Sequence, residues 1–330
     1  MPGLEPIYRE PMRRKILYII TKSDTGGAQK YVRDLAGGID ATKFEVTVFA
    51  GGKDSSMGSR QGLRWLSNKV YPHALFANDW LALFELVRTF RRERPDVIHL
   101  NSSKAGVIGS FAAGIYKFTL YPKPYTLPRV VFTAHGWVFN PTNHPPALVR
   151  WCYILLHKLA ARFQDVIVNV SEYDRNLALH YRIAPVSKLV TIHNGIDPNI
   201  KFLPKELARK TILERLTPIP YTSSSLKTHP VQGLRPFRIE RQSLNDLNPN
   251  LPWIGSIGRL TKEKDYKTLI RAAQLVPDAY FFIIGEGPEK KNLQRITYNL
   301  QLNGRFFFIE PTGNDAVFLK AFDVFAMSSI

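Results

Sequence analysis

Two cations follow a short apolar run in the segment Trp253-Ile254-Gly255-Ser256-Ile257-Gly258-Arg259-Leu260-Thr261-Lys262-Glu263-Lys264. Arg259 comes directly after a glycine, Lys264 follows five residues later, and a helical pattern begins just beyond. Cations beside a helix N-terminus suit a diphosphate, because side-chain charge and free backbone N–H groups act on the same anion. The spacing therefore predicts a diphosphate clamp made by Arg259 and Lys264, with Gly258 at the turn.

A second turn in the same half of the chain has the sequence Ile283-Ile284-Gly285-Glu286-Gly287-Pro288. Gly285 and Gly287 are predicted to open space for a ligand ring, and Glu286 can accept hydrogen bonds from hydroxyl groups. Both turns follow strands of one predicted sheet. Together they indicate a binding site for a nucleotide-linked ligand.

The first half offers its own glycine turn, Thr25-Gly26-Gly27-Ala28-Gln29, between the first strand and the first helix. Glycines at such a turn let backbone approach a phosphate closely. The dinucleotide fingerprint is incomplete, because no third glycine follows at the required spacing. An ordinary turn is the alternative reading.

Two further polar motifs of the first half lie at expected strand ends. His135 stands in Thr133-Ala134-His135-Gly136-Trp137, where ligands of open α/β sheets bind. Lys104 stands in Asn101-Ser102-Ser103-Lys104-Ala105-Gly106, at the start of a helix. We predict that His135 is catalytic and that Ser103, Lys104 and Trp137 contact an acceptor. A structural histidine and a solvated lysine are the alternatives.

Apolar runs of strand length alternate with helical patterns, which predicts a doubly wound parallel sheet. The strands expected in the first half are Lys15–Thr21, Phe44–Ala50, Asp96–Leu100, Arg129–Thr133, Asp165–Val170 and Lys188–Ile192. The helices expected there are Ala28–Gly37, Asp79–Glu93, Lys104–Lys117, Pro146–Phe163 and Glu172–Tyr181.

The second half repeats this architecture after a segment without periodicity, Leu216–Asn250, which is rich in proline and serine. Its expected strands are Trp253–Ile257, Tyr280–Ile284, Arg305–Ile309 and Asp323–Met327, and its expected helices are Asp265–Val276, Glu289–Leu300 and Asn314–Phe322. We therefore predict domains at residues 1–196 and 252–330, joined by a linker with an insertion at 197–251.

Composition narrows the class of protein. The 330 residues carry a net charge of +18, most of it in residues 1–195, and hold a single cysteine, Cys152. One cysteine excludes an internal disulfide and fits a reducing compartment, so we expect a cytoplasmic protein. No apolar run is long enough to cross a bilayer. The sequence shows no basic-aromatic nucleic-acid motif, no metal-ligand spacing and no hydrolase elbow, so neither nucleic acid nor a metal is expected.

Two expected helices combine bulky apolar and basic residues. Residues 146–158 include Trp151 among leucines and cations, and residues 80–94 end in several arginines. Such helices can lie on anionic lipid, which suggests peripheral contact with a membrane surface. The alternative is a core helix with a solvated basic face.

Taken in order, these motifs resemble glycosyltransferase family 4, whose members have the GT-B fold. The resemblance covers about residues 15–330 and is closest to members that make capsule, exopolysaccharide or other cell-envelope glycans. The motifs that carry it include Gly26-Gly27, Ser102-Ser103-Lys104-Ala105-Gly106, Ala134-His135-Gly136-Trp137, Val170-Ser171-Glu172, Asn194-Gly195-Ile196-Asp197, Gly258-Arg259-Leu260 with Lys264, and Gly285-Glu286-Gly287-Pro288. It implies two Rossmann-like domains facing a central cleft.

The resemblance also implies an activity: retaining transfer of a sugar from a nucleotide-diphosphate donor to a glycan or lipid-linked acceptor, without a metal. Arg259 and Lys264 match the pair that neutralises the departing diphosphate. His135 matches a histidine near the transferred sugar, Gly27 the turn near the donor phosphates, and Glu286 a residue on the nucleoside side.

The family carries two glutamates, eight positions apart, beyond a strand that matches the one ending at Ser328-Ser329, whereas this sequence stops at Ile330. We therefore expect a second domain that is truncated relative to the family. The alternatives are an inactive nucleotide-sugar-binding fragment, a nucleotide-sugar epimerase of the same fold and, more remotely, a dehydrogenase.

Overall fold

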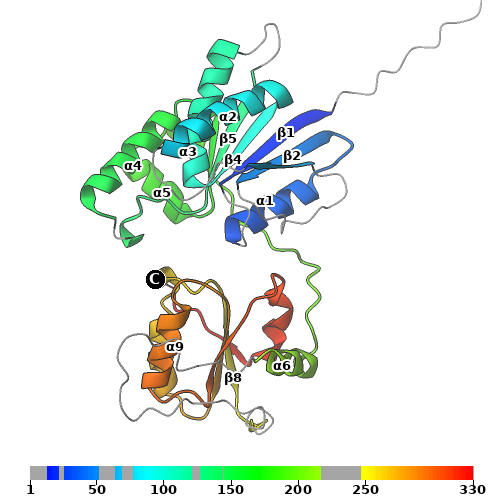
Figure 1. Ribbon diagram of the computed structural model, residues 1–330, viewed down its shortest axis with the longest axis vertical. Coiled ribbons are helices and arrows are strands. Elements are labelled where there is room, and N and C mark those ends of the chain that lie inside the picture. Colours follow the sequence, from blue (N-terminus) through cyan, green and yellow to red (C-terminus); the bar gives the residue numbers. More distant parts are fainter. Residues whose placement is uncertain are drawn as a thin grey trace, which may run out of the picture. The chain divides into compact units, whose positions relative to one another are not determined.

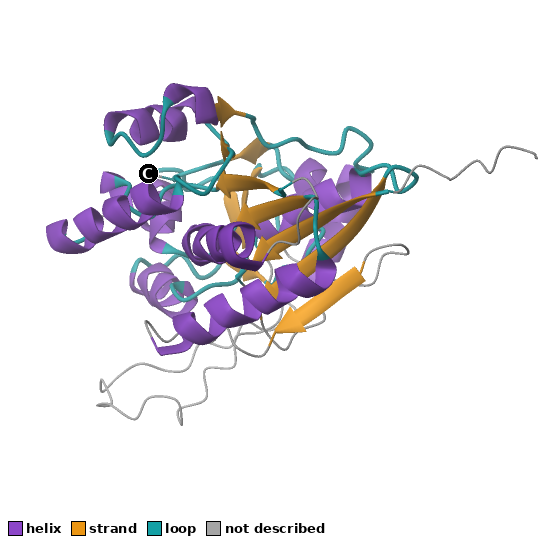
Figure 2. Cartoon of the chain, turned by 90° about the horizontal axis from the view of Figure 1, so that it is seen from above, coloured by secondary structure: helices purple, strands orange, loops and turns teal. Residues whose placement is uncertain are grey.

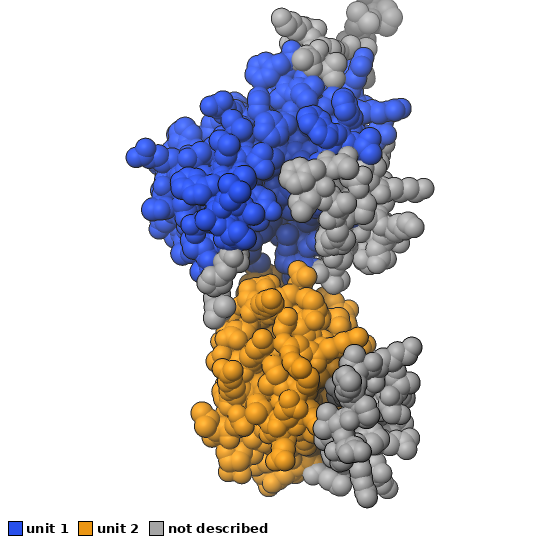
Figure 3. All heavy atoms as spheres, turned by 60° about the vertical axis from the view of Figure 1, so that its left-hand side comes forward, with its two compact units in different colours: residues 1–195 blue, residues 196–330 orange. Residues whose placement is uncertain are grey.

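A computed structural model of the chain describes residues 13–21, 26–51, 64–68, 77–120, 127–143, 145–216 and 247–329. The chain divides into two compact units, residues 1–195 and 196–330, which Figure 3 colours separately. Each unit has its own parallel sheet, of seven strands in unit 1 and four in unit 2. The predicted α/β class with two doubly wound domains is confirmed.

The sheet of unit 1 has the strand order β3-β2-β1-β4-β5-β6-β7, and every neighbouring pair is parallel. Its strands are β1 Arg14–Ile20, β2 Phe44–Gly51, β3 Arg64–Asn68, β4 Val97–Asn101, β5 Arg129–Ala134, β6 Val166–Asn169 and β7 Leu189–Thr191. The order reverses between β1 and β4. In open α/β sheets the carboxyl ends of such a pair border the ligand site.

Helices cover both faces of this sheet (Figures 1 and 2). They are α1 Gly27–Gly38, α2 Ala77–Glu93, α3 Ser103–Ile115, α4 Ala147–Ala160 and α5 Glu172–His180, with the short η1 Tyr116–Leu120, η2 Pro141–Asn143 and η3 Val186–Lys188. Because successive side chains of a strand point to opposite faces, Leu17 and Ile19 share a core with α2, α3 and α4, whereas Tyr18 and Ile20 pack with α1.

Unit 2 has the strand order β10-β9-β8-β11, again parallel. Its elements are α6 Lys205–Glu214, β8 Trp253–Ile257, η5 Lys262–Lys264, α8 Tyr266–Gln274, β9 Tyr280–Ile284, α9 Lys290–Asn299, β10 Phe306–Ile309, η6 Asp315–Ala321 and β11 Val324–Phe325. Phe281 and Ile283 pack with α8 and α9, whereas Tyr280 and Phe282 pack with α6 and η6. Two cores on alternating faces make this sheet doubly wound as well.

Helix α6 differs most from the sequence-based expectation, which assigned it to the linker. Ala208 and Ile212 are fully buried in the core of unit 2. Asp323 binds α6 through ion pairs of 2.5 Å to Lys205 and 2.6 Å to Arg209, and it accepts a hydrogen bond from the Trp253 N–H. The helix is therefore part of unit 2, which begins at Ile196.

Other differences are local. Strand β3 was not predicted, the expected helix 314–322 is the 3-10 helix η6, and β11 is shorter than the strand expected at 323–327. Most of the predicted insertion at 216–250 lies outside the described residues. No helix among the described residues is long and apolar enough to cross a membrane.

Candidate functional site

Arg259 stands on a backbone segment that is fixed on both sides. The segment leaves β8 and continues beside the turn after β9: the Gly258 N–H donates to the Ile284 carbonyl and the Leu260 N–H to the Glu286 carbonyl, both at 3.0 Å. The Leu260 carbonyl accepts from the Glu289 N–H, also at 3.0 Å. Leu260 is fully buried, whereas Arg259 is exposed. The fold thus anchors Leu260 in the core, and the guanidinium of Arg259 beside it faces solvent.

The glycines of the second turn have a different role from the one predicted. A Cβ on Gly285 would lie 2.0 Å from the Gly258 carbonyl oxygen, and one on Gly287 would lie 2.4 Å from the Leu260 carbonyl oxygen. The space beside them is therefore filled by the Arg259 segment. The prediction that they open room for a ligand ring is wrong at these contacts. They let two loops pack closely, which holds Arg259 in place.

Lys264 ends the short helix η5, and its carbonyl accepts a hydrogen bond of 2.8 Å from the Ser328 hydroxyl. Asp265 follows in the left-handed conformation, at φ 40°, and α8 starts at the next residue. The half-buried Lys264 side chain folds back toward Gly258, because its Cε lies 3.8 Å from where a Cβ on Gly258 would be. Among the residues that the structure describes, neither Arg259 nor Lys264 forms an ion pair.

Glu286 lies between these loops and α9. It forms an ion pair of 2.5 Å with Lys290, which also contacts Glu310 at 3.3 Å. Partial burial acts to lower the pKa of Lys290, but the hydrogen bonds and charges of the two carboxylates outweigh it and raise that pKa. The Glu286 side chain is about half exposed, so it can still accept hydrogen bonds from a ligand.

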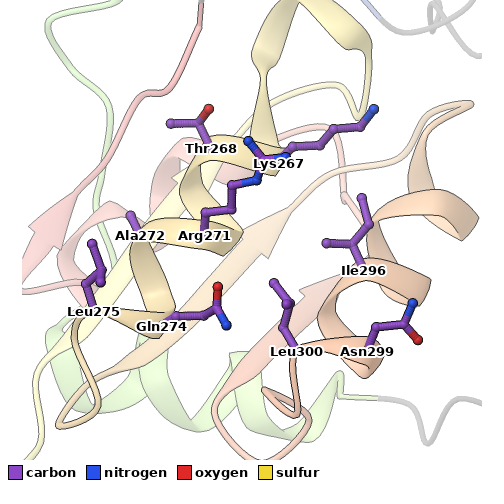
Figure 4. A pocket seen from close by; sticks show the side chains of 9 residues that line it. All are labelled: Lys267, Thr268, Arg271, Ala272, Gln274, Leu275, Ile296, Asn299 and Leu300. Carbon is purple, nitrogen blue, oxygen red and sulfur yellow. The ribbon is translucent and has the colours of Figure 1, made fainter.

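A surface groove of unit 2 lies elsewhere, between α8 and α9 (Figure 4). Its volume is about 720 Å³, and its lining includes Lys267, Arg271 and Leu275. None of the predicted site residues lines it. We therefore do not assign this groove to the donor.

In unit 1 the candidate residues meet where β1, β4 and β5 end. Ile20 pairs with Asn101, and Asn101 pairs with Thr133, so these strands finish side by side. Gly26 precedes α1 and Gly27 is its first residue, whereas Thr25 lies outside the described residues. Gly27 is exposed, and no described atom lies within 4 Å of a Cβ built on it. Nothing described around Gly27 thus requires a glycine.

His135 is half-buried at this edge, where its ring contacts Tyr31 edge-on at 4.7 Å between centroids. Its Nε2 is buried without a hydrogen-bond partner in the described part of the chain, and the same holds for Oδ1 of Asn101. Burial lowers the pKa of His135 from 6.5 to about 4. The imidazole is therefore neutral near pH 7 and able to exchange a hydrogen bond with a ligand hydroxyl.

A second histidine, His99, supports this edge and was not predicted. Its Nε2 lies 2.8 Å from the Thr133 hydroxyl, which is also 3.5 Å from the Tyr31 hydroxyl. Burial, and to a smaller extent the proximity of His135, lowers the pKa of His99 to about 4. The network joins three elements through neutral groups. The only sign of this network in the sequence is the presence of a histidine, His99, inside an apolar strand.

The predicted acceptor residues do not all lie at the surface. Ser103 and Lys104 open α3 after Ser102, whose hydroxyl caps the helix by accepting from the Ala105 N–H. Lys104 forms an ion pair of 2.5 Å with Asp79 on α2. Trp137 is 1% exposed, and its Nε1 donates to Asn169 and to the Asp174 carbonyl. Because Trp137 belongs to the core, we correct its assignment as an acceptor contact.

Metal-ligand geometry is not seen in the described ranges, where no group of three or more His, Cys, Asp or Glu side chains comes together.

Comparison with solved structures defines the class of fold. The crystal structure of HepE from Anabaena, in complex with UDP and glucose, superposes with a TM-score of 0.69 at 18% identity, covering 96% of this chain and 74% of that one. At that identity the likeness shows the fold alone, which is GT-B with two Rossmann-like domains.

Models of protein families, compared with the sequence, identify the family of this chain. The model described as Glycosyltransferase Family 4 matches residues 25–200, and the model described as Glycosyl transferases group 1 matches residues 238–330. The chain belongs to glycosyltransferase family 4.

Two curated relatives from Escherichia coli match most of the chain. A UDP-Gal:alpha-D-GlcNAc-diphosphoundecaprenol alpha-1,3-galactosyltransferase is 25% identical over 76% of this chain and 56% of that protein. The O-antigen biosynthesis glycosyltransferase WclY is 23% identical over 72% of this chain and 55% of that protein. The chain spans about half the length of these relatives.

Proposed function

We propose that the protein transfers a sugar, with retention of configuration, from a nucleotide-diphosphate donor to a glycan or lipid-linked acceptor during synthesis of a cell-envelope polysaccharide. The observation that carries the proposal is the pair of cations beside Gly258. Arg259 is exposed, Lys264 folds back over the same turn, and neither is neutralised by a described acid. The names of the curated relatives support the donor and acceptor classes.

The chemistry follows from charge. As the bond between sugar and diphosphate breaks, negative charge grows on the leaving phosphate. Fixed cations stabilise that charge more than they stabilise the ground state, which is the largest catalytic term in many enzymes. Arg259 offers two parallel N–H groups to phosphate oxygens, and Lys264 adds a point charge. No cofactor or metal is included in this proposal.

Unit 1 is proposed to contact the transferred sugar, the donor phosphates and the acceptor. Neutral His135 would exchange a hydrogen bond with a hydroxyl of the transferred sugar, and the exposed backbone at Gly27 would approach the donor phosphates. Ser103 and Lys104 would contact the acceptor. The lone cysteine, Cys152, fits the reducing cytoplasm, where we propose that the protein acts.

The test is calorimetric titration with UDP and UDP-galactose, the donor named for the Escherichia coli relative. We expect the double variant Arg259→Ala/Lys264→Ala to bind about a hundredfold more weakly or worse, because two charge-assisted contacts are lost. The matched control is Lys267→Ala/Arg271→Ala, which removes the same charge from the groove between α8 and α9.

Equal affinity in the parent and the clamp variant would refute the assignment of Arg259 and Lys264. If the control variant bound the donor as weakly as the clamp variant, the loss of affinity would reflect the lower net charge of unit 2 and not the position of Arg259 and Lys264. Donor binding without any sugar transfer would favour a binding module over an enzyme.

A further inference from the structure

Helix α4 presents a second apolar face, away from the core. Ile154, His157 and Ala160 are buried on its inner side. On its outer side Leu148 is 77% exposed, Trp151 58% and Leu155 57%. These three positions follow the i, i+3, i+7 spacing of one helical face, and Cys152 and Leu156, both exposed, fall on the same stripe. A stripe of this kind on a helix surface needs a partner.

The stripe continues over the neighbouring helices. Helices α2, α3 and α4 cover the same face of the sheet, and α3 packs against both of the others (Figure 1). Their outer sides carry further exposed apolar residues: Trp80, Leu81 and Phe84 on α2, Ile115 on α3 and Phe118 on η1. We call this layer, with the α4 stripe, the α2–α4 surface. Both tryptophans that are exposed in the described part of the chain lie on it.

The charge of the surface is positive. Exposed Arg88, Arg91 and Arg92 follow the aromatic residues on α2, and α4 contains Arg150 and Lys158 but no acidic residue. Helix α2 also carries the acids Asp79, Glu85 and Glu93, which balance its three arginines. The net positive charge of the surface therefore comes from Lys104 on α3 and from Arg150 and Lys158 on α4. Cations that flank exposed tryptophan and leucine side chains complement an anionic lipid surface.

We propose that the α2–α4 surface docks on an anionic bilayer, with Leu148, Trp151 and Leu155 entering the headgroup region. A second copy of the chain is a poorer occupant, because a symmetric contact would bring the same arginines together. Tryptophan suits the headgroup level, where one side of the ring meets hydrocarbon and the other meets water. The inference goes beyond sugar transfer and does not depend on it.

Vesicle co-sedimentation of the full chain tests the proposal without donor or acceptor. Vesicles of phosphatidylcholine alone are compared with vesicles containing a quarter phosphatidylglycerol. We expect binding to the anionic vesicles that weakens as salt rises. Trp151→Glu/Leu155→Glu should weaken it about tenfold or more, because two apolar side chains are replaced by charges that anionic lipid repels.

The matched control makes the same kind of change on unit 2. Leu275 and Val276 are 83% and 41% exposed, so Leu275→Glu/Val276→Glu adds two acids at the surface of the other unit. It should leave vesicle binding unchanged. All four positions are exposed, and unfolding midpoints confirm that both variants are folded. A third variant, Arg88→Gln/Arg91→Gln/Arg92→Gln, should reduce the preference for anionic vesicles.

Three results would overturn the proposal. The first is no binding to anionic vesicles by the parent chain. The second is an equal loss of binding in the α4 variant and the unit 2 control. The third is a dimer in light scattering that Trp151→Glu/Leu155→Glu converts to a monomer, which would assign the surface to a second copy.

Discussion

Unit 2 places Arg259 and Lys264 beside one glycine, without acidic partners in the described residues, whereas unit 1 gathers neutral groups at the corresponding edge of its sheet. Burial keeps His99 and His135 uncharged near pH 7, and Asp79 offsets the charge of Lys104. An anion is bound by cations whose charge is still available, and hydroxyl groups are bound by neutral donors and acceptors. If both units contact a substrate as proposed, unit 2 would recognise its anionic part and unit 1 would supply mainly neutral groups.

The units also differ in how they hold their residues. In unit 2, backbone packs on backbone at Gly285 and Gly287, so the cationic turn is set by the main chain. In unit 1, side chains of α1, β4 and β5 hold one another through Tyr31, His99 and Thr133. The contact between the two loops of unit 2 leaves no room for a Cβ at Gly285 or Gly287. The network of unit 1 is made by side chains, so we expect that one of them can be replaced while the backbone stays in place.

The largest effect in this comparison is expected from Gly285→Ala. The added Cβ would overlap the Gly258 carbonyl oxygen at 2.0 Å, so the loops must separate. We expect a loss of about 3 kcal/mol or more in the free energy of unfolding, together with weaker donor binding, because Arg259 moves with its loop. Urea unfolding and calorimetry with UDP measure the two effects.

Gly27→Ala is the matched substitution in unit 1. With no described atom within 4 Å, the first turn of α1 should accept alanine and gain up to about 1 kcal/mol. If the backbone at this turn approaches the donor phosphates, sugar transfer should nevertheless fall. A Gly285→Ala protein as stable as the parent would contradict the backbone packing inferred for unit 2.

Sequence patterns were sufficient for most of the fold because parallel strands are buried on both faces and read as continuous apolar runs. The cationic turn was predictable because its residues are neighbours in sequence. The function of Gly285 was not, since it depends on a carbonyl from a segment more than twenty residues earlier. The role of Trp137 was misjudged and His99 was missed for a similar reason, because burial decides what each side chain contacts.

Acid should weaken unit 1 before unit 2. Burial lowers the pKa of His157 from 6.5 to about 4, as it does for His99 and His135. Between these values the unfolded chain binds protons that the folded unit excludes, so stability falls as the pH drops from about 6.5 to about 4. For the fully buried His157 the loss reaches about 3 kcal/mol.

The described part of unit 2 contains no histidine. There, burial opposes ionisation of Asp323, but hydrogen bonds and charges from Lys205, Trp253 and Arg209 outweigh it and lower the pKa of Asp323 below 3.8. Its contribution is lost only at more acidic pH. Hydrogen exchange at pH 7, 5.5 and 4.5 can follow the two units separately. His157→Leu should reduce the loss of protection in unit 1 at low pH, whereas the control His180→Gln, at an exposed position, should not. An equal loss of protection in the two units would contradict this prediction.

The smallest expected effect concerns Lys104, the one cation assigned to the acceptor in unit 1. Its ion pair with Asp79 is about one-third exposed on each side and is worth at most about 1 kcal/mol. To bind an acceptor phosphate, Lys104 must give up that partner. Asp79→Asn should therefore lower the KM for a phosphate-bearing acceptor by up to about fivefold, and Lys104→Met should raise it. An Asp79→Asn enzyme with unchanged KM would show that Lys104 only joins α2 to α3, leaving unit 1 with neutral groups alone for substrate recognition.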